Sequence, residues 1–506
     1  MTATLPHVWP TVVHMLADAA KRSPGQAAVA CAGESLTYAQ YAACVSGLAH
    51  ALREAGAGIG ARVILLMGNS IDIAVALFAV QAAGAQVVPL NPDFTGAELA
   101  PMIESAAAQA VIYDTAAGLR LAPLLDRFAS RFEVGDGCWK FTRWGNDHGL
   151  AARLPLPDPA ALSMLQFTGG TSGRPKGVDL VHEAVAINVS QREALVPCDA
   201  GAERVLAITP LFHIYAIAMG LYLTAYCRGT LVVVPRYRPD VVLEAVQRHG
   251  ITIMLGSPTI FVGLMAFQDF SKYDLSSLRV CPSGASALPG ETLARWESLT
   301  GCRIAEGYGQ TESGPVLAFN PRHGTSKAGS VGMVAPGTDV QIVDAESGRL
   351  VLPAGQLGEI RARGPQIMKG YRGRPAETAE VLRDGWLYTG DVGEFDADGY
   401  LYIRDRKKEM VIVGGYNVYP REVEDALTTH PHVLEAAVVG VPDAYRGEAL
   451  IACVATREPK PDQEALLEHL RTRLVRYKLP SRIVFMDTLP KTGIGKIDKN
   501  RIRQHV

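Results

Sequence analysis

The stretch YAQYAACVSGLAHALREAGAGIGARVILLMGNSIDIAVALFAVQAAGAQVVPL, residues 38–90, decides the fold class. We predict amphipathic or buried helices over residues 38–55 and 71–83. Buried strands are predicted over residues 62–67 (RVILLM) and 86–90. Strands that alternate with helices build parallel sheets, so an α/β architecture with sizeable, largely parallel sheets is expected. No repeat of fixed period is visible, which excludes a solenoid.

Within this stretch, AGAGIGARV (residues 55–63) contains the pattern G-x-G-x-x-A. The pattern follows a predicted helix and precedes a predicted strand, whereas a dinucleotide site needs the order strand, loop, helix. We therefore interpret it as a helix–strand turn, which removes the case for an NAD-dependent enzyme.

Length and net charge limit the classes of protein to which the chain can belong. At about 150 residues per domain, 506 residues suggest about three domains or subdomains. Basic residues number 49 and acidic residues 51, so the formal charge of −2 lacks the basic excess that a nucleic-acid partner requires. The 8 cysteines form no C-x-x-C pair, so we expect no zinc site, no disulfide framework and a reducing, cytoplasmic location.

One uncharged segment, between Arg204 and Arg228, is long enough to cross a bilayer. Pro210, His213 and a turn-like TPLFHIY interrupt it, so we interpret it as a buried strand, loop and helix. The uncharged residues 251–267 contain a proline and are interpreted in the same way. The N-terminal residues show no basic leader followed by an apolar run, so neither a signal peptide nor a transmembrane segment is expected.

A domain boundary is predicted near Asp405, where a strand-like YLYIRD runs into the charged RDRKKE, which suits an exposed linker. Beyond it, PREVEDALTTH begins with Pro420 at a favourable first-turn position of a helix. A second helix over residues 462–475 places Leu466, Leu467, Leu470 and Leu474 on one face. The predicted domains are therefore residues 1–404 and a small α+β unit, residues 405–506.

FTGGTSGRPKG, residues 167–177, is the strongest local signal of chemistry. Glycines let backbone N–H groups approach phosphate oxygens, hydroxyls donate further hydrogen bonds, and Lys176 adds charge. It is not a Walker A loop, because G-x-x-x-x-G-K-[ST] is not matched. A flexible surface loop is the alternative, but the preceding apolar strand and Lys176 favour a phosphate loop.

Three further clusters carry chemistry-bearing residues. EGYGQTE, residues 306–312, sets an aromatic ring beside a carboxylate, which suits base stacking and Mg²⁺. YTGDV places Asp391 at a predicted strand end, where it could accept from ribose hydroxyls or simply occupy a turn. PKTGIGKID, residues 490–498, carries Lys496 on a glycine-bearing loop, and by itself such a lysine is usually solvated.

Taken in order, these clusters resemble the core motifs of the adenylate-forming superfamily of acyl-CoA synthetases, firefly luciferases and peptide-synthetase adenylation domains. PLFHIYA (210–216), PSGASAL (282–288) and RDRKKEMVIVGGYNVYPREVE (404–424) resemble further motifs, so the likeness spans about residues 20–505. Within the superfamily the chain is most similar to bacterial long-chain fatty acid–CoA ligases, with 4-coumarate-type ligases next. The resemblance implies a large N-terminal domain built from βαβ units and a small, mobile C-terminal domain.

The resemblance also implies an ATP- and Mg²⁺-dependent ligase that converts a carboxylic acid, foremost a fatty acid, to an acyl-AMP and then to an acyl-CoA. Lys496 would bridge the carboxylate and the α-phosphate, Thr311 would contact the α-phosphate, Glu312 would bind Mg²⁺, and His213 would sit at the carboxylate end of the acyl pocket. Residues implied to bind ATP or AMP are Thr168, Gly169, Gly170, Thr171, Ser172, Gly173, Lys176, Gly284, Ala285, Glu306, Gly307, Tyr308, Gly309, Asp391 and Arg406, with Tyr308 against the adenine and the last two on the ribose. Ile214, Tyr215 and Phe261 would line the acyl pocket.

For the thioester step, the resemblance implies a rotation of the small domain about Lys408. That rotation would present Gly414 and Gly415 to a tunnel for the pantetheine arm of CoA, where any side chain would narrow the passage. Ala285 and Ser286 stand where many relatives read Gly-Ala or Ala-Pro, which leaves the size of the acid open.

Other activities share these motifs. An aryl- or cinnamate-type CoA ligase and an adenylating enzyme that loads a carrier protein in trans would both use the same first half-reaction. A luciferase-type oxygenase shares the motifs as well. A non-catalytic binding relative would be expected to lack Lys496 or Glu312, and both are present.

Overall fold

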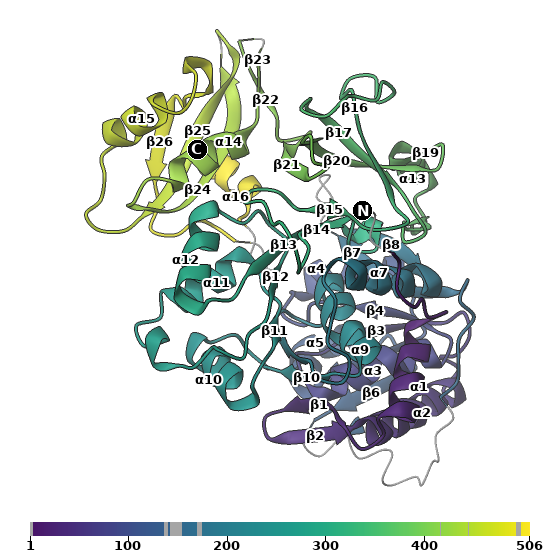
Figure 1. The fold of residues 1–506 in the computed structure, drawn as a ribbon. Helices are drawn as coiled ribbons and strands as arrows, with labels where there is room; N and C mark the ends of the chain where they lie inside the picture. Colours follow the sequence, from purple (N-terminus) through teal and green to yellow (C-terminus); the bar gives the residue numbers. More distant parts are fainter. Residues whose placement is uncertain are drawn as a thin grey trace.

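The computed structural model describes residues 4–135, 140–141, 154–168, 175–414, 416–443, 445–491 and 497–506. Over these residues the chain forms five sheets, four in the part up to Arg406 and one in the C-terminal part. Figure 1 shows the C-terminal part, in yellow-green, as a separate body beside α12 and β13 of the large part. The α/β fold class with a small α+β C-terminal unit is confirmed.

The predicted stretch forms the middle of a seven-stranded sheet, in the order β18-β8-β7-β4-β3-β5-β6. The helices are α2 (Tyr38–Glu54) and α3 (Ile71–Ala82), and the strands β3 (Arg62–Leu66) and β4 (Gln86–Pro89) pair in parallel. The remaining strands are β5 (Ala110–Asp114), β6 (Ser130–Val134), β7 (Leu162–Thr168), β8 (Lys176–Val181) and β18 (Gly370–Tyr371). Strand β8 runs antiparallel to β7 and β18, and the pairs that join β7, β4, β3, β5 and β6 are parallel, so the expectation of a largely parallel sheet holds here.

A second sheet is also mainly parallel, with the order β11-β9-β10-β1-β2. Its strands are β1 (Ala27–Cys31), β2 (Glu34–Thr37), β9 (Arg204–Ala207), β10 (Thr230–Val233) and β11 (Ile253–Met254). Isolated parallel bridges join β11 to a mixed four-stranded sheet of β12 (Cys281–Ser283), β13 (Ile304–Tyr308), β14 (Ala318–Phe319) and β15 (Met333–Val334). Strand β13 therefore lies between β12, its parallel partner, and β14, its antiparallel partner.

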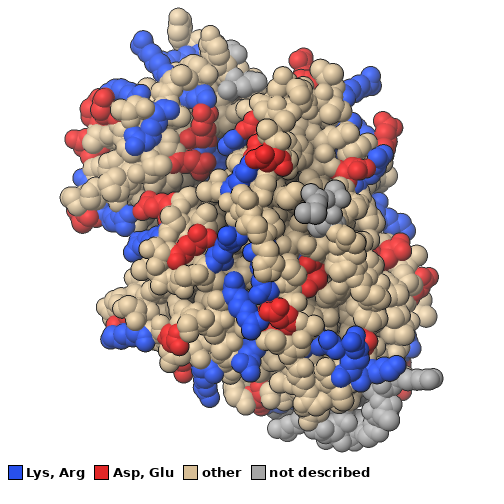
Figure 2. Space-filling model, viewed as in Figure 1, with Lys and Arg blue, Asp and Glu red and all other residues tan. Residues whose placement is uncertain are grey.

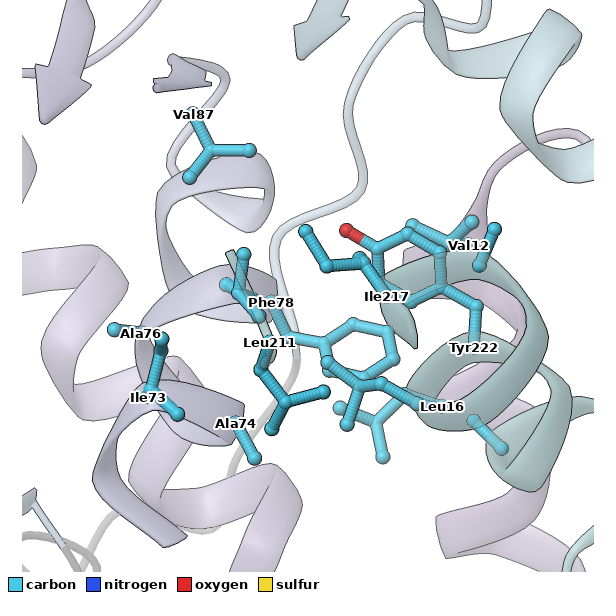
Figure 3. Close-up of a cluster of buried hydrophobic side chains, with 14 of the residues drawn as sticks. Val12, Leu16, Ile73, Ala74, Ala76, Phe78, Val87, Leu211, Ile217 and Tyr222 are labelled. Carbon is cyan, nitrogen blue, oxygen red and sulfur yellow. The ribbon is translucent and has the colours of Figure 1, made fainter. Parts of the chain in front are cut away.

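The uncharged segment after Arg204 forms β9, a loop, α8 (Ile214–Ala216), a π-helical turn (Ile217–Tyr222) and α9 (Leu223–Cys227), as interpreted from sequence. Among the described residues, no helix combines the length and the apolar character that crossing a membrane requires. Figure 3 shows Ile217 and Tyr222 of this segment packed beside Phe78 of α3 and Leu16 of α1 (Val12–Arg22). The rings of Phe78 and Tyr222 meet edge-on, with centroids 5.1 Å apart.

An antiparallel sheet follows in the order β16-β17-β20-β19, with β21 also paired to β20. Its strands are β16 (Asp339–Val343), β17 (Gly358–Arg363), β19 (Leu382–Arg383), β20 (Trp386–Phe395) and β21 (Leu401–Arg406). The other helices of the large part are α4 (Gly96–Ala106), α5 (Thr115–Leu125), α7 (His182–Leu195), α10 (Pro239–His249), α11 (Pro258–Met265), α12 (Gly290–Thr300) and α13 (Pro375–Val381). Lysines and arginines are interspersed with acidic residues on the face drawn in Figure 2, which fits the near-zero net charge.

The C-terminal part has the sheet order β23-β22-β25-β24, with β26 against β25. Its strands are β22 (Val411–Val413), β23 (Tyr416–Val418), β24 (Val433–Asp443), β25 (Gly447–Thr456) and β26 (Arg482–Phe485), and its helices are α14 (Pro420–Thr428), α15 (Gln463–Arg471) and α16 (Lys499–His505). Helix α15 ends four residues before the predicted end at 475, although Leu474 still packs on the core of this part. The domain boundary at 404/405 stays a prediction, and β21 runs on through Asp405 and Arg406.

Candidate active site

Three strands bring a phenol, a carboxylate and a guanidinium together beside the end of β13. The hydroxyl of Tyr308 donates to Asp391 Oδ2 at 2.6 Å, and Nε of Arg406 lies 3.6 Å from Oδ1. Asp391 of β20 and Arg406 of β21 are direct cross-strand partners, so the sheet itself sets their spacing. Burial and the neighbouring Asp391 raise the pKa of Tyr308 well above its ordinary value, which keeps its proton on oxygen.

Asp391 does not lie at a strand end, and that detail of the sequence prediction is wrong. It lies within β20, which continues to Phe395, and the β20–β21 register shifts between Val392 and Gly393. Gln310 was not predicted as a site residue, yet its Nε2 donates to Asp391 Oδ2 at 2.7 Å. The signal was present, because Gln310 belongs to the quoted EGYGQTE cluster.

Glycines in this cluster are required by close backbone approach. A Cβ at Gly307 would lie 2.3 Å from the ring of Phe319, and one at Gly309 would lie 1.8 Å from the carbonyl oxygen of Pro315. Neither contact is possible for a real side chain, so both positions hold the loop tight against β14 and the segment that follows Glu312.

Thr311 and Glu312 begin a 3₁₀ turn, Thr311–Ser313, which follows shortly after the end of β13. Glu312 is half-buried, and its Oε1 accepts a hydrogen bond from the hydroxyl of Tyr371 at 2.9 Å. Tyr371 comes from β18, 59 residues further along the chain, so sequence spacing gave no indication of it. A fixed carboxylate is the donor type that Mg²⁺ prefers, so Glu312 fits a magnesium ligand.

Strands β7 and β8 form the two sides of the glycine-rich connection. Thr168 ends β7 and is paired with Lys176, which begins β8. Lys176 Nζ lies 2.5 Å from Glu377 Oε2 and 4.9 Å from the ring centre of Tyr371. The predicted phosphate-binding residues Gly169, Gly170, Thr171, Ser172 and Gly173 lie outside the described residues.

Glu306 lies in β13, and the PSGASAL segment begins in β12, the strand paired with β13. Glu306 is buried and accepts the N–H of Leu288 at 2.9 Å, and burial raises its pKa to about 7. Gly284 follows β12, and a Cβ there would lie 3.3 Å from Cζ of Tyr215. Ala285 has φ +71°, a left-handed conformation that glycine adopts without strain but that costs energy for alanine.

The predicted acyl-pocket residues fall into two places. Nδ1 of His213 accepts the N–H of Tyr215 at 3.4 Å, and Ile214 and Tyr215 are buried in α8, directly before the π-helical turn. π-Helical turns are rare and are frequent at functional sites. Phe261 belongs to another hydrophobic cluster, where its ring packs edge-on against Trp296 at 5.0 Å.

The small part meets the large part at Asp405. This residue is buried rather than exposed, so the expectation of an exposed linker is wrong at this position. Its Oδ2 accepts the N–H of Arg421 in the first turn of α14 at 2.9 Å, where a carboxylate complements the helix dipole. Lys408 is exposed in the turn after β21, and Gly414 has φ +58°, while Gly415 lies outside the described residues.

Lys496 also lies outside the described residues, but both flanks of its segment are anchored. Lys491 and Ile497 form a β-bridge, and Lys491 pairs with Glu435 at 2.7 Å. Lys499, three residues after Lys496, is half-buried and pairs with Glu424 at 2.7 Å and Glu409 at 2.9 Å. These contacts tie the predicted catalytic loop to the first residues after the hinge.

Comparison with known proteins decides the family. The model of the family described as AMP-binding enzyme matches residues 16–372, and that of the AMP-binding enzyme C-terminal domain matches residues 422–496. The chain belongs to the AMP-binding enzyme family. Among curated members, it is 36% identical to a long-chain-fatty-acid–CoA ligase of Bacillus subtilis, over 98% of this chain and 96% of that protein. It is 38% identical to a feruloyl-CoA synthase of an Amycolatopsis species, over 96% and 97%.

Solved structures of AMP-binding enzymes share the whole fold. ATP-bound MatB from Rhodopseudomonas palustris superposes with a TM-score of 0.91 at 29% identity, covering 98% of both chains. The anthranilate CoA ligase AuaEII in complex with anthranoyl-AMP gives a TM-score of 0.91 at 27% identity, covering 100% of this chain and 99% of that one. On the evidence of these relatives, the chain is an AMP-forming carboxylate–CoA ligase. It uses ATP, Mg²⁺ and CoA, and its reaction proceeds through an acyl-AMP.

Proposed function

We propose that this ligase acts in the cytoplasm on a carboxylic acid with an apolar body, either a fatty acid or an aryl acid. The observation that carries the proposal is the buried, uncharged segment that begins beside His213 and packs Tyr215 against Gly284. An apolar lining with few polar groups is what holds and orients an apolar acyl group. The two curated relatives, named for long-chain fatty acids and for feruloyl-CoA, support these two acid classes.

In the first half-reaction, an oxygen of the acid attacks the α-phosphorus of ATP and pyrophosphate leaves. The protein's contribution is positioning and charge neutralisation. We assign the ribose to Asp391 and Arg406, the adenine to Tyr308, and the triphosphate to Thr168, Lys176, Thr311 and the glycine-rich residues between β7 and β8. In this structure Lys176 pairs with Glu377, so binding of phosphate would have to compete for its charge.

Glu312 is the proposed Mg²⁺ ligand, held by the hydroxyl of Tyr371. When bound, Mg²⁺ neutralises charge on the phosphates. Lys496 is proposed to stabilise the charge that develops between the carboxylate and the α-phosphate. Loss of one such contact typically lowers the rate by about 10²–10³.

In the second half-reaction, the thiol of CoA attacks the acyl carbonyl and AMP leaves. We propose that the small part first turns about Lys408, which would break the contact between Asp405 and the first turn of α14. Gly414 and Gly415 are the proposed lining of the CoA passage. Hinge residues of this kind alter turnover without touching the substrate.

The test is pyrophosphate release by the purified protein with ATP and Mg²⁺, across saturated fatty acids, dicarboxylic acids and aryl acids. Each acid is assayed with and without CoA, and each acyl-CoA product is identified by mass. CoA-dependent turnover that peaks on an apolar acid is the expected result. Slow release that CoA does not change, with accumulation of acyl-AMP, would instead support a carrier protein as acceptor.

A further inference from the structure

The turn that joins the large part to the small part carries an ion pair on each side of its third residue. Residues 406–409 form this turn, which is closed by a hydrogen bond from the N–H of Glu409 to the carbonyl oxygen of Arg406 at 2.9 Å. Lys407 and Lys408 are the two residues between them. Because Lys408 is the proposed hinge, the contacts of its two neighbours decide which residues can turn with the small part and which cannot.

Lys407, directly before the hinge, is fastened to the large part. Its ammonium Nζ lies 2.8 Å from Glu359 Oε2 of β17, and its backbone N–H donates to the carbonyl oxygen of Gly390 in β20 at 2.8 Å. The side chain of Glu359 is 5% exposed, and that of Lys407 is 38% exposed. An ion pair with one buried partner is screened less by water and salt than a surface pair. Residue 407 is therefore bound to the large part through both its backbone and its side chain.

Glu409, directly after the hinge, is fastened to the small part. Its Oε2 lies 2.9 Å from Nζ of Lys499 in α16. The same ammonium lies 2.7 Å from Oε1 of Glu424 in α14, and that oxygen also accepts the N–H of Val438 in β24 at 2.7 Å. These three elements belong to the C-terminal part. The chain therefore passes from one part to the other across a single residue, Lys408.

These two attachments limit how the small part can turn. While Lys407 and Glu409 stay bound to opposite parts, a change of orientation must be absorbed mainly by the φ and ψ angles of Lys408, since peptide bonds stay planar. Without the attachments, the same change would be spread over several residues, and the small part would come to rest over a range of positions. A displacement of about 1 Å from a productive geometry can lower a rate by about 10². The two ion pairs therefore affect the rate of any step that needs the small part to be placed accurately.

The two half-reactions do not depend equally on these pairs. In the orientation of this structure a further contact holds the two parts together, because Asp405 of β21 accepts the N–H of Arg421 in α14 at 2.9 Å. The proposed rotation breaks this contact before CoA reacts. The thioester half-reaction then lacks it, and therefore depends more strongly on the attachments beside the hinge than acyl-AMP formation does.

We propose that the ion pairs on either side of the hinge are positioning pairs, which confine the rotation to one residue and thereby sustain the rate of the thioester half-reaction. The pairs are Lys407 with Glu359 and Glu409 with Lys499. This inference rests on the proposed function and deepens it, because it names the residues that hold the hinge in place. The four residues act through the orientation of the small part rather than by contact with a substrate.

The test is the rate constant of each half-reaction, measured separately by rapid quench on the acid that gives the highest turnover. Acyl-AMP formation is followed without CoA, and the thioester step is followed after CoA is added to enzyme that already holds acyl-AMP. Lys407→Met combined with Glu359→Gln, which leaves no buried charge unpaired, should lower the ratio of the thioester rate to the adenylation rate by about 10-fold to 10²-fold. Glu409→Gln should lower the ratio in the same direction, and Lys407→Arg, which keeps the charge, should keep most of it.

Lys327→Met is the matched control. Lys327 pairs with Asp396 at 2.6 Å in the turn between β20 and β21, so it binds the same hairpin at the end away from the hinge. Its ratio should equal that of the unchanged protein. Because each ratio compares two rate constants of one protein, partial loss of folded enzyme cancels.

Three outcomes overturn the inference alone. They are an unchanged ratio in the variant that lacks both Lys407 and Glu359, an equally low ratio in Lys407→Arg, and an equal fall in the Lys327 variant. In contrast, no CoA-dependent turnover of any acid by the unchanged protein overturns the proposed function on which the inference rests.

Discussion

Lys499 forms a largely buried cluster of ion pairs, and the effect of removing its charge on stability can be calculated. Its ammonium lies 2.7 Å from Glu424 and 2.9 Å from Glu409, and its side chain is 17% exposed. Burial lowers the pKa of Lys499, but the carboxylates outweigh that effect and the net pKa is raised. Lys499→Met would leave both carboxylates without their cation, and breaking a buried pair in this way costs about 3–5 kcal/mol.

The expected shift of the apparent Tm follows from an unfolding entropy of about 2.1 cal/mol/K per residue. A loss of about 3 kcal/mol lowers Tm by about 3 °C if all 506 residues unfold together, and by about 14 °C if about 100 C-terminal residues unfold alone. Differential scanning calorimetry measures both the shift and the number of transitions. Lys478→Met is the matched control, since Lys478 pairs with Glu422 at 2.6 Å but that carboxylate is 41% exposed, and such pairs contribute about 0–1 kcal/mol.

The pH dependence gives a second check on the Lys499 cluster. A lysine whose folded pKa is raised contributes stability that is fully present below its unfolded pKa, so the protein with Lys499 keeps this contribution from pH 5 to 9. In the variant, burial raises the pKa of Glu424, so its protonation at acidic pH relieves the unpaired charge. The amount by which Lys499→Met lowers the Tm of the protein should therefore be smaller at pH 5 than at pH 8. A Lys499 variant as stable as the Lys478 variant at pH 8 would refute the reasoning.

Three further changes have defined outcomes. Lys496→Ala should lower the rate of acyl-AMP formation by about 10²–10³-fold, while CoA still reacts with supplied acyl-AMP at an unchanged rate. Rapid-quench assays measure the two rates separately, and an equal fall in both would refute this expectation. Ala285→Gly relieves a left-handed alanine, so unfolding by urea should show a gain of about 0.5–1 kcal/mol, and a loss would contradict the strain. Glu306 has a folded pKa of about 7, raised by burial, so its contribution to stability falls as pH rises from about 4.5 to 7. Glu306→Gln, which keeps an acceptor for Leu288, should flatten Tm over that range, and an unchanged slope would count against it.

The spacing of apolar residues along the sequence predicted those helices and strands that are determined by interactions between residues close together in the chain. The four helices and strands predicted over residues 38–90 each begin at the predicted residue and end one residue earlier than expected. The alternation of apolar strands with helices leaves few other ways to bury these residues, so the parallel pairing of β3 and β4 followed as well.

Contacts between distant segments were not predictable from the sequence. Tyr371 reaches Glu312 across 59 residues and Gln310 reaches Asp391 across 81, and neither spacing has a local signature. Asp405 was expected to be exposed because it opens a charged run, but the backbone N–H of Arg421 satisfies its carboxylate and allows it to be buried.

The most direct test of the central claim, activation of the acid through an acyl-AMP, is isotope transfer. The acid that gives the highest turnover is labelled with ¹⁸O in both carboxylate oxygens and incubated with ATP, Mg²⁺ and CoA. Attack of the carboxylate on the α-phosphorus, followed by cleavage of the acyl–oxygen bond by the thiol, leaves one ¹⁸O in the AMP and one in the acyl-CoA. Mass spectrometry showing one ¹⁸O per AMP is the predicted result, and unlabelled AMP, or label in inorganic phosphate with release of ADP, would contradict the account.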